Sequence, residues 1–296
     1  MGLEKQYEKI LHGTNGRELF EVDAHGKKIR KLGRQEPISG NNITTTLDLE
    51  IQKSVHESMR DVKKGAVVVT DPQSGGILVL YSKPSFDPNL FTQPESYEAS
   101  GEYRNVLQVI NDQENQPLLD RAISGTYPPG STYKLITATA ALETGAMKSN
   151  TIIEDTGQIT VGGATFGNWY FLQYGKTEGP VDVIRAIARS NDIYFYRAAE
   201  KTGIDKIAEW SGEFQLGKKL GIDLPQEAKG LVPSKKWKKA ELNEDWYTGD
   251  SFNLGIGQGY LLTTPLQINA MASVFANGDG ILYRQHLVKE ANTAIK

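Results

Sequence analysis

Ser131 and Lys134 are the residues of this sequence whose types and spacing could perform covalent chemistry. They lie in YPPGSTYK, residues 127–134. Residues three apart on a helix share one face, so the lysine amine can reach the serine hydroxyl. A serine becomes nucleophilic when a neighbour accepts its proton, and a lysine can do so where burial keeps its amine neutral. The pair therefore has the geometry of a nucleophile and its base, with Ser131 as the candidate nucleophile and Lys134 as the candidate base.

The spacing of this pair is not selective by itself. With 16 serines and 23 lysines in 296 residues, about one serine is expected by chance to have a lysine three positions later, and Ser131 is the one that does. In the alternative interpretation, Ser131 caps an ordinary helix and the Lys134 amine extends into solvent. Leu135, Ile136 and the alanines after them favour a buried helix, and its N-terminus would stabilise negative charge near Ser131.

The elements that must position this pair are mainly helices. STYKLITATAALETG predicts a helix that begins at Ser131 and ends at Gly145. Residues 181–203 predict two helices that meet near Ser190. Turn signals, β-rich runs and a cap predict the remaining elements: a hairpin with strands at 65–71 and 76–82, a helix that begins near Asp48, and a helix that ends at Gly278.

Two units are predicted, with a boundary in EPISGNN, residues 36–42, where proline, glycine and paired asparagines favour turns. Before it, residues 2–12 predict a short helix and residues 18–30 predict a hairpin. We therefore assign residues 1–40 to a small N-terminal unit and residues 41–296 to one large domain.

Composition excludes several function classes. The chain is 39% hydrophobic with a net charge of −3, and its lysine pairs are too scattered for a nucleic-acid surface. It has no cysteine, which excludes disulfides and thiolate chemistry, and its four histidines are far apart, so we predict no metal and no cofactor. No apolar run is long enough to span a bilayer, and the N-terminus lacks the order of a signal peptide.

Beyond these patterns, the sequence resembles a known enzyme family. YPPGSTYKLITATAALETG, preceded by DRAISG, is similar to the active-serine segment of penicillin-binding proteins, whose signature set is Ser-x-x-Lys, Ser-Asp-Asn and Lys-Thr-Gly. Four other segments are similar to parts of their transpeptidase domain: TTTLDLEIQ, GAVVVTDPQSGGILVLYSKPSFDPN, LGIDLPQEAKGLVP and GIGQGYLLTTPLQ. The resemblance covers roughly residues 44–283 and is greatest to class B enzymes of the penicillin-binding protein 2 type.

This resemblance implies an α+β fold of the transpeptidase and serine β-lactamase type, an antiparallel sheet flanked by helices with its C-terminal strands missing. Residues 1–40 would be the remnant of the non-catalytic pedestal (dimerisation-type) domain, and residues 41–296 an incomplete transpeptidase domain. It also implies a peptidoglycan D,D-transpeptidase that crosslinks stem peptides through an acyl-serine intermediate and that β-lactams acylate.

Resemblance adds Ser190 and Asp192 to the catalytic residues. Ser190, Asn191 and Asp192 match the family's second motif, which implies that Ser190 shuttles a proton between Lys134 and the leaving group. Asp192 replaces the commoner asparagine of that motif. In an alternative that is compatible with this role, residues 190–192 cap the following helix.

The third motif, Lys-Thr-Gly on a strand, is expected well after the GQG segment, and the chain ends at Lys296 before it. The literal Lys201, Thr202 and Gly203 are interpreted as the end of a helix. In the family, the motif's strand supplies an oxyanion donor and a cation for the substrate carboxylate. The expectation is therefore that the chain is a fragment, by itself inactive, with an apolar sheet edge left uncovered.

The implied partners are peptidoglycan stem peptides, β-lactam antibiotics, a glycosyltransferase and other cell-wall synthesis proteins. The implied location is the bacterial cell envelope, at the outer face of the cytoplasmic membrane, through an N-terminal anchor absent from this chain. Two alternatives stay open at this point: a β-lactamase or β-lactam sensor of the same fold, and a catalytically dead relative that binds wall polymer or a scaffold.

Overall fold

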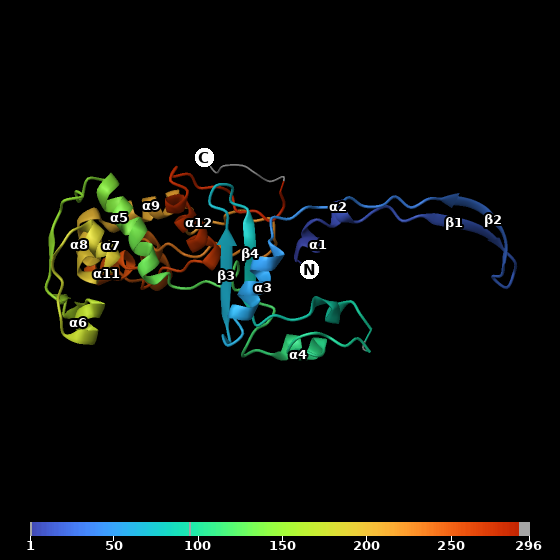
Figure 1. The fold of residues 1–296 in the computed structure, drawn as a ribbon, viewed down its shortest axis with the longest axis horizontal. Helices are drawn as coiled ribbons and strands as arrows, with labels where there is room; N and C mark the ends of the chain where they lie inside the picture. Colours follow the sequence, from blue (N-terminus) through green and yellow to red (C-terminus); the bar gives the residue numbers. More distant parts are fainter. Residues whose placement is uncertain (1, 95, 290–296) are drawn as a thin grey trace.

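The computed structural model describes residues 2–94 and 96–289. Within these residues the strands form four two-stranded antiparallel sheets, β1–β2, β3–β4, β5–β8 and β6–β7. The strands are β1 Arg17–Val22, β2 Lys28–Gln35, β3 Gly65–Thr70, β4 Ile77–Lys83, β5 Ile153–Asp155, β6 Gln158–Val161, β7 Ala164–Gly167 and β8 Gly179–Val181. Most of the helices lie together in one body, from which β1 and β2 project as an arm (Figure 1).

The helices of the described residues fall into a long C-terminal series and a few short early ones. They are α1 Gly2–Gln6, α2 Glu8–Leu11, α3 Leu49–Ser58, η1 Pro88–Phe91, α4 Val106–Asn111, η2 Gly130–Tyr133, α5 Lys134–Glu143, α6 Trp169–Tyr174, α7 Val183–Ala188, α8 Asp192–Thr202, α9 Ile204–Glu213, α10 Lys235–Leu242, α11 Thr248–Gly255 and α12 Pro265–Ala276. The elements η1 and η2 are 3₁₀-helices, which are usually short because their hydrogen bonds are less well aligned.

The N-terminal arm is formed by the predicted hairpin. Its strands are almost wholly exposed, and the large apolar side chains Leu19, Ile29 and Leu32 remain more than half accessible. The predicted helix over residues 2–12 is broken at Tyr7 into α1 and α2. The Tyr7 hydroxyl donates to Asp223 Oδ2 at 2.8 Å, which ties this segment to the helical body.

The hairpin predicted at residues 65–82 is β3–β4, and it is covered by helices. The Asp48 carboxylate caps α3, as predicted, by accepting from the backbone N–H groups of Glu50 and Ile51. α3 packs against β4, and α12 packs against β3. Ile77 on β4 is fully buried in a cluster that includes Leu266 of α12. The predicted antiparallel sheet flanked by helices is thus confirmed, with β3 and β4 as its two strands among the described residues.

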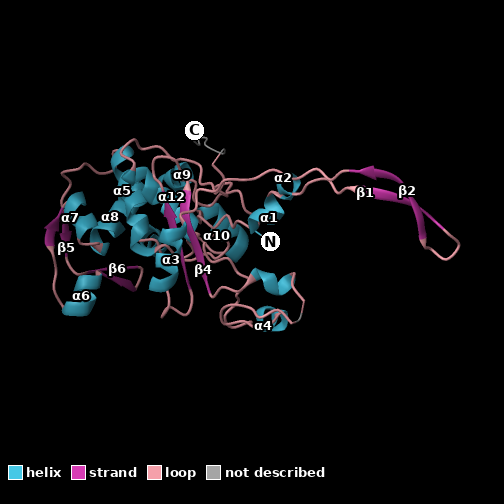
Figure 2. Cartoon of the chain, turned by 45° about the vertical axis from the view of Figure 1, so that its right-hand side comes forward, coloured by secondary structure: helices cyan, strands magenta, loops and turns pink. Residues whose placement is uncertain are grey.

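α5 lies inside the helical body and carries the predicted nucleophile segment at its start. It packs against α8 and α9, and Ile136 and Ala140 on its faces are fully buried. Figure 1 shows α5, α7, α8 and α11 gathered at the end of the molecule opposite the arm, and Figure 2 shows α5, α7 and α8 at the same end. The two helices predicted to meet near Ser190 are α7 and α8, which are separated by a turn of three residues.

Candidate active site

Ser131 lies on an exposed turn at the start of the buried helix. It belongs to η2, and the chain continues directly into α5 at Lys134. The N-cap positions of η2 and α5 are Pro129 and Tyr133, and neither side chain makes a capping hydrogen bond. The alternative in which Ser131 serves as a helix cap is therefore wrong, and its hydroxyl is left for other chemistry.

The glycine-rich segment GIGQG, residues 255–259, packs against the turn that carries Ser131. Gly130 has φ +60°, a left-handed conformation that suits glycine, and its N–H donates to Gly257 O at 2.9 Å. A Cβ atom at Gly257 would lie 2.1 Å from Gly130 O, so the close approach requires glycine there. Further along, in α5, the Thr137 hydroxyl donates to Gly255 O at 2.9 Å. The GIGQG segment thus fixes the position of the turn that carries Ser131.

The amine of Lys134 is buried and lies against the second motif. Lys134 is 3% exposed, so the alternative in which it extends into solvent is wrong. Its Nζ donates to Ser190 O at 2.8 Å, to Ser190 Oγ at 3.0 Å, and to Asp192 Oδ1 at 2.6 Å. The Phe195 ring centroid lies 5.5 Å from the same Nζ. Lys134, Ser190 and Asp192 are therefore brought together, one helical turn from Ser131.

Two opposing effects set the proton affinity of Lys134. Burial disfavours the charged amine and holds the pKa of Lys134 below its ordinary value, whereas the charge and hydrogen bond of Asp192 oppose this decrease. A lysine with a lowered pKa can act as a base near neutral pH. The arrangement thus provides a buried amine that can exchange a proton with the Ser190 hydroxyl.

The backbone of Ser190 is held in an unusual conformation. Its φ is +51°, which is uncommon for a residue other than glycine, and it ends α7 with backbone hydrogen bonds from Ser190 N to Ile187 O and from Asn191 N to Ala186 O. Both the carbonyl and the hydroxyl of Ser190 accept from the Lys134 amine. Asn191, and not Ser190, caps α8 by accepting from Tyr194 N at 2.9 Å. The cap and the proposed proton relay are therefore served by different residues of the motif.

Asp192 is held by residues that the sequence analysis did not identify. Its Oδ2 accepts from the backbone N–H of Trp169 at 3.0 Å, and its own backbone N–H donates to Asn168 Oδ1 at 3.1 Å. Asn168 is fully buried and occupies the N-cap position of α6, although its side chain does not cap that helix. An N-cap residue type before an aromatic run was the one sequence signal for this element.

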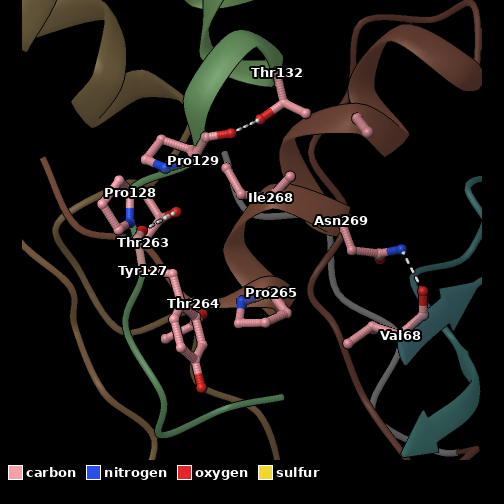
Figure 3. Close-up of a pocket in the computed structure, with 11 residues that line it drawn as sticks. Val68, Tyr127, Pro128, Pro129, Thr132, Thr263, Thr264, Pro265, Ile268 and Asn269 are labelled. Atoms are coloured by element: carbon pink, nitrogen blue, oxygen red, sulfur yellow. Dashed lines mark hydrogen bonds between the residues drawn. The ribbon is translucent and has the colours of Figure 1, made fainter. Parts of the chain in front are cut away.

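A cavity of about 350 Å³ lies beside the serine turn. Pro129, which precedes η2, and Thr132 of η2 line one side, and Val68 of β3 lines the opposite side (Figure 3). The Thr132 hydroxyl donates to Pro129 O, and the Asn269 amide donates to Val68 O. None of the predicted catalytic residues, Ser131, Lys134, Ser190 and Asp192, is among the residues that line this cavity.

The literal Lys201-Thr202-Gly203 sequence is the end of a helix, as interpreted. α8 ends at Thr202, and the Gly203 N–H donates to Ala199 O at 3.0 Å. Among residues 2–94 and 96–289, no group of three or more histidine, cysteine and acidic side chains could hold a metal ion. No helix in this part of the chain is long and apolar enough to cross a bilayer.

Comparison with family models places these features in one family. Residues 65–295 match the penicillin binding protein transpeptidase domain, and residues 1–45 match the penicillin-binding protein dimerisation domain. Peptidoglycan D,D-transpeptidase MrdA of Escherichia coli K12 is 40% identical over 290 residues, which are 97% of this chain and 44% of that protein. Peptidoglycan D,D-transpeptidase MrdA of Haemophilus influenzae is 37% identical over all of this chain, which corresponds to 44% of that protein. The chain thus spans less than half the length of these relatives.

Solved structures give the same assignment. The penicillin-binding protein 2 (PBP2) of Helicobacter pylori, in complex with MreC, superposes with a TM-score of 0.84 at 32% identity, over 98% of this chain and 52% of that one. The PBP2 of Pseudomonas aeruginosa, in complex with WCK 5153, superposes with a TM-score of 0.79 at 32% identity, over 96% and 56% of the two chains. The chain therefore belongs to the penicillin-binding protein transpeptidase family and, within it, resembles the class B proteins of the penicillin-binding protein 2 type.

Proposed function

We propose that this chain carries the acyl-serine chemistry of a peptidoglycan D,D-transpeptidase. The observation that supports this function best is the buried Lys134 amine, which lies within hydrogen-bond distance of Ser190 and Asp192 and one helical turn from the exposed Ser131. The catalytic residues would be Ser131, Lys134, Ser190 and Asp192. Family membership supports the reaction class, and the side-chain geometry supports the proposed roles.

The first half of the reaction acylates the enzyme. Ser131 Oγ attacks the carbonyl carbon of the D-alanyl-D-alanine bond in a stem peptide while its proton passes to the neutral Lys134 amine. The tetrahedral intermediate then expels the terminal D-alanine. Its leaving nitrogen takes a proton from the Ser190 hydroxyl, which is replenished by Lys134 across the 3.0 Å contact. The product is an ester between Ser131 and the shortened stem peptide.

The second half transfers the acyl group. An amine of a neighbouring stem peptide attacks the ester carbonyl, gives up its proton along the same path in reverse, and releases Ser131 with its hydroxyl restored. A β-lactam would acylate Ser131 by the first of these halves, because its strained amide presents the same carbonyl. Asp192 accepts a hydrogen bond from Lys134 and keeps the amine against the Ser190 hydroxyl.

The partners and location follow from the same proposal. Stem peptides and β-lactams would bind beside Ser131, and the relevant proteins would be a glycosyltransferase and other cell-wall synthesis proteins. Two solved neighbours support this, one a complex of PBP2 with MreC and one described as a peptidoglycan synthase complex. We place the protein in the cell envelope and propose attachment to the outer face of the cytoplasmic membrane through an N-terminal anchor. We also propose that residues 1–40 form the end of a pedestal domain and residues 41–296 the transpeptidase domain.

Covalent labelling tests the proposed function. The product of the complete reading frame, incubated with a fluorescent penicillin, should be labelled one to one, and Ser131→Ala should abolish the label. Thr132→Ala is a matched control, because Thr132 is the exposed neighbour on the same turn and its hydroxyl donates to Pro129 O. Absence of labelling in the wild-type product would refute the proposal, and rapid release of hydrolysed penicillin would show a β-lactamase instead.

A further inference from the structure

The buried carboxylate of Asp155 contacts Asn191 of the second motif and accepts hydrogen bonds from four groups in all. Asp155, the last residue of β5, is 1% exposed. Its Oδ1 accepts from Gly157 N at 2.8 Å. Its Oδ2 accepts from the side-chain amides of Asn168 and Asn191 and from the backbone N–H of Glu178, each at 2.9 Å. All four donors face one carboxylate, so Asp155 is saturated with hydrogen bonds.

The two asparagines connect this carboxylate to the residues around Lys134. Asn168 Oδ1 accepts from Asp192 N, so its amide nitrogen is the atom that faces Asp155. Asn191 Oδ1 accepts from Tyr194 N, so its amide nitrogen also faces Asp155. Both asparagines are fully buried, and both amides use donor and acceptor at once. The orientation of each amide is therefore determined by its partners.

Asp192 is thus held at two points by consecutive residues. Its backbone N–H is bound by the Asn168 side chain, and its Oδ2 is bound by the Trp169 N–H. With Oδ2 occupied, Oδ1 is directed at Lys134 Nζ, 2.6 Å away. A carboxylate that is bound at one oxygen has little freedom to rotate, so the base is aligned through Asp192.

We propose that Asp155, Asn168 and the Trp169 N–H are positioning residues of the acylation reaction, which hold Asp192 so that the Lys134 amine stays against the Ser190 hydroxyl. The proposal deepens the transpeptidase function given above and rests on it. None of these three groups touches the reacting atoms. They act through Asp192, and the polar and charged groups that face the Lys134 amine are Asp192 and Ser190, with the Phe195 ring beside them.

The backbone contact can be removed with a matched pair of variants. Trp169 is the first residue of α6, a position where proline is tolerated, and Asn168 before it is extended at φ −75° and ψ 137°, as a residue before proline prefers. Trp169→Pro removes the N–H that binds Asp192, whereas Trp169→Ala keeps it, and both remove the indole. We expect acylation by a fluorescent penicillin to be roughly 10- to 100-fold slower in the proline variant than in the alanine variant.

The side-chain contact is tested by Asn168→Ala, with Asn277→Ala as control. Asn277 is also a buried amide that bonds backbone groups, but it lies at the end of α12. Both variants should lose comparable stability in thermal melts. Asn168→Ala should in addition move the acid limb of the acylation rate to lower pH, because a displaced Asp192 no longer supports the charge on Lys134. A pH profile identical to that of the control would overturn the proposal.

A second readout separates this proposal from the proposed function. Titration of the Lys134 side chain by NMR in isotope-labelled lysine, assigned with Lys134→Arg, needs no substrate. If the wild-type product is not acylated, the proposed function fails, and a Lys134 titration that shifts in Asn168→Ala would still support the positioning network. A different result would overturn the positioning role. The wild type would be acylated, Trp169→Pro and Trp169→Ala would react at rates within twofold of each other, and the titration of Lys134 would be unchanged in Asn168→Ala.

Discussion

Replacing Asp192 with asparagine removes one charge from the buried pair and leaves its shape nearly intact. The Lys134 amine would keep Ser190 as a hydrogen-bond partner and lose the carboxylate 2.6 Å away. Because both side chains are largely buried, at 3% and 12% exposure, solvent cannot replace the lost charge. We therefore expect Asp192→Asn to lower both the free energy of unfolding and the pKa of Lys134.

Two limits give the size of the stability loss at pH 7. If Lys134 keeps its proton, an unpaired buried charge remains, which costs about 3–5 kcal/mol. If it releases the proton, the cost is at most that of neutralising a lysine whose unfolded pKa is 10.5, which is about 5 kcal/mol at 1.36 kcal/mol per pH unit. Both limits agree, so we expect a loss of about 3–5 kcal/mol.

The pH dependence gives the sharper test. The pKa of Lys134 is lower in the folded than in the unfolded chain, so folding releases a proton between the two values and stability rises with pH there. In Asp192→Asn this window begins at lower pH, because the pKa of the folded Lys134 falls further without the carboxylate. The difference in free energy of unfolding between the wild type and Asp192→Asn, measured by urea denaturation, should therefore be smaller at pH 10 than at pH 7. A difference below about 1 kcal/mol at pH 7, or one that does not change with pH, would refute the reasoning.

Three further predictions concern the support of the site and the arm. Gly257→Ala should lower the free energy of unfolding by about 2–4 kcal/mol and slow acylation. Gly278→Ala, which has a similar φ and open space around it, should lower it by only about 1 kcal/mol. Equal melting temperatures of the two variants would contradict this prediction. Thr137→Val should cost about 1–2 kcal/mol in urea denaturation by leaving a buried carbonyl of α11 unpaired, and a stability equal to wild type would mean that the bond is dispensable. Leu32→Ser on the exposed arm should change stability by less than about 0.5 kcal/mol, whereas Ile136→Ala in α5 should cost about 2–5 kcal/mol; a large effect of Leu32→Ser would show that the arm packs on something.

The residues of the proposed site could be predicted where their chemistry was local in sequence. Ser131 and Lys134 are three residues apart, and Ser190 and Asp192 two apart, so helix geometry and the family motifs identified both pairs. The helix ends at Asp48 and Gly145 followed from capping rules in the same way, since a cap is a contact between near neighbours.

Asp155, Asn168 and Trp169 could not be predicted because their contacts are remote in sequence. β5 has three residues and β6 and β7 four each, which is too short for an alternating pattern to be read. The hydrogen bonds that give Asn168 its place reach 13 residues back and 24 residues forward. Such contacts depend on how the segment closes on itself, and single-sequence rules describe only neighbours.

The segment between Gly157 and Glu178 can change in length without a change at its two ends. The Asp155 carboxylate binds Gly157 N and Glu178 N, so one side chain joins the two ends of a 22-residue excursion that carries β6, β7 and α6. The entropy cost of a longer loop grows only slowly with its length once its ends are fixed. Residues inserted at the exposed Gly162 and Gly163 turn would lengthen the excursion at its tip and leave its base unmoved. The segment can therefore vary in length among related proteins while Asp192 stays where the chemistry requires it.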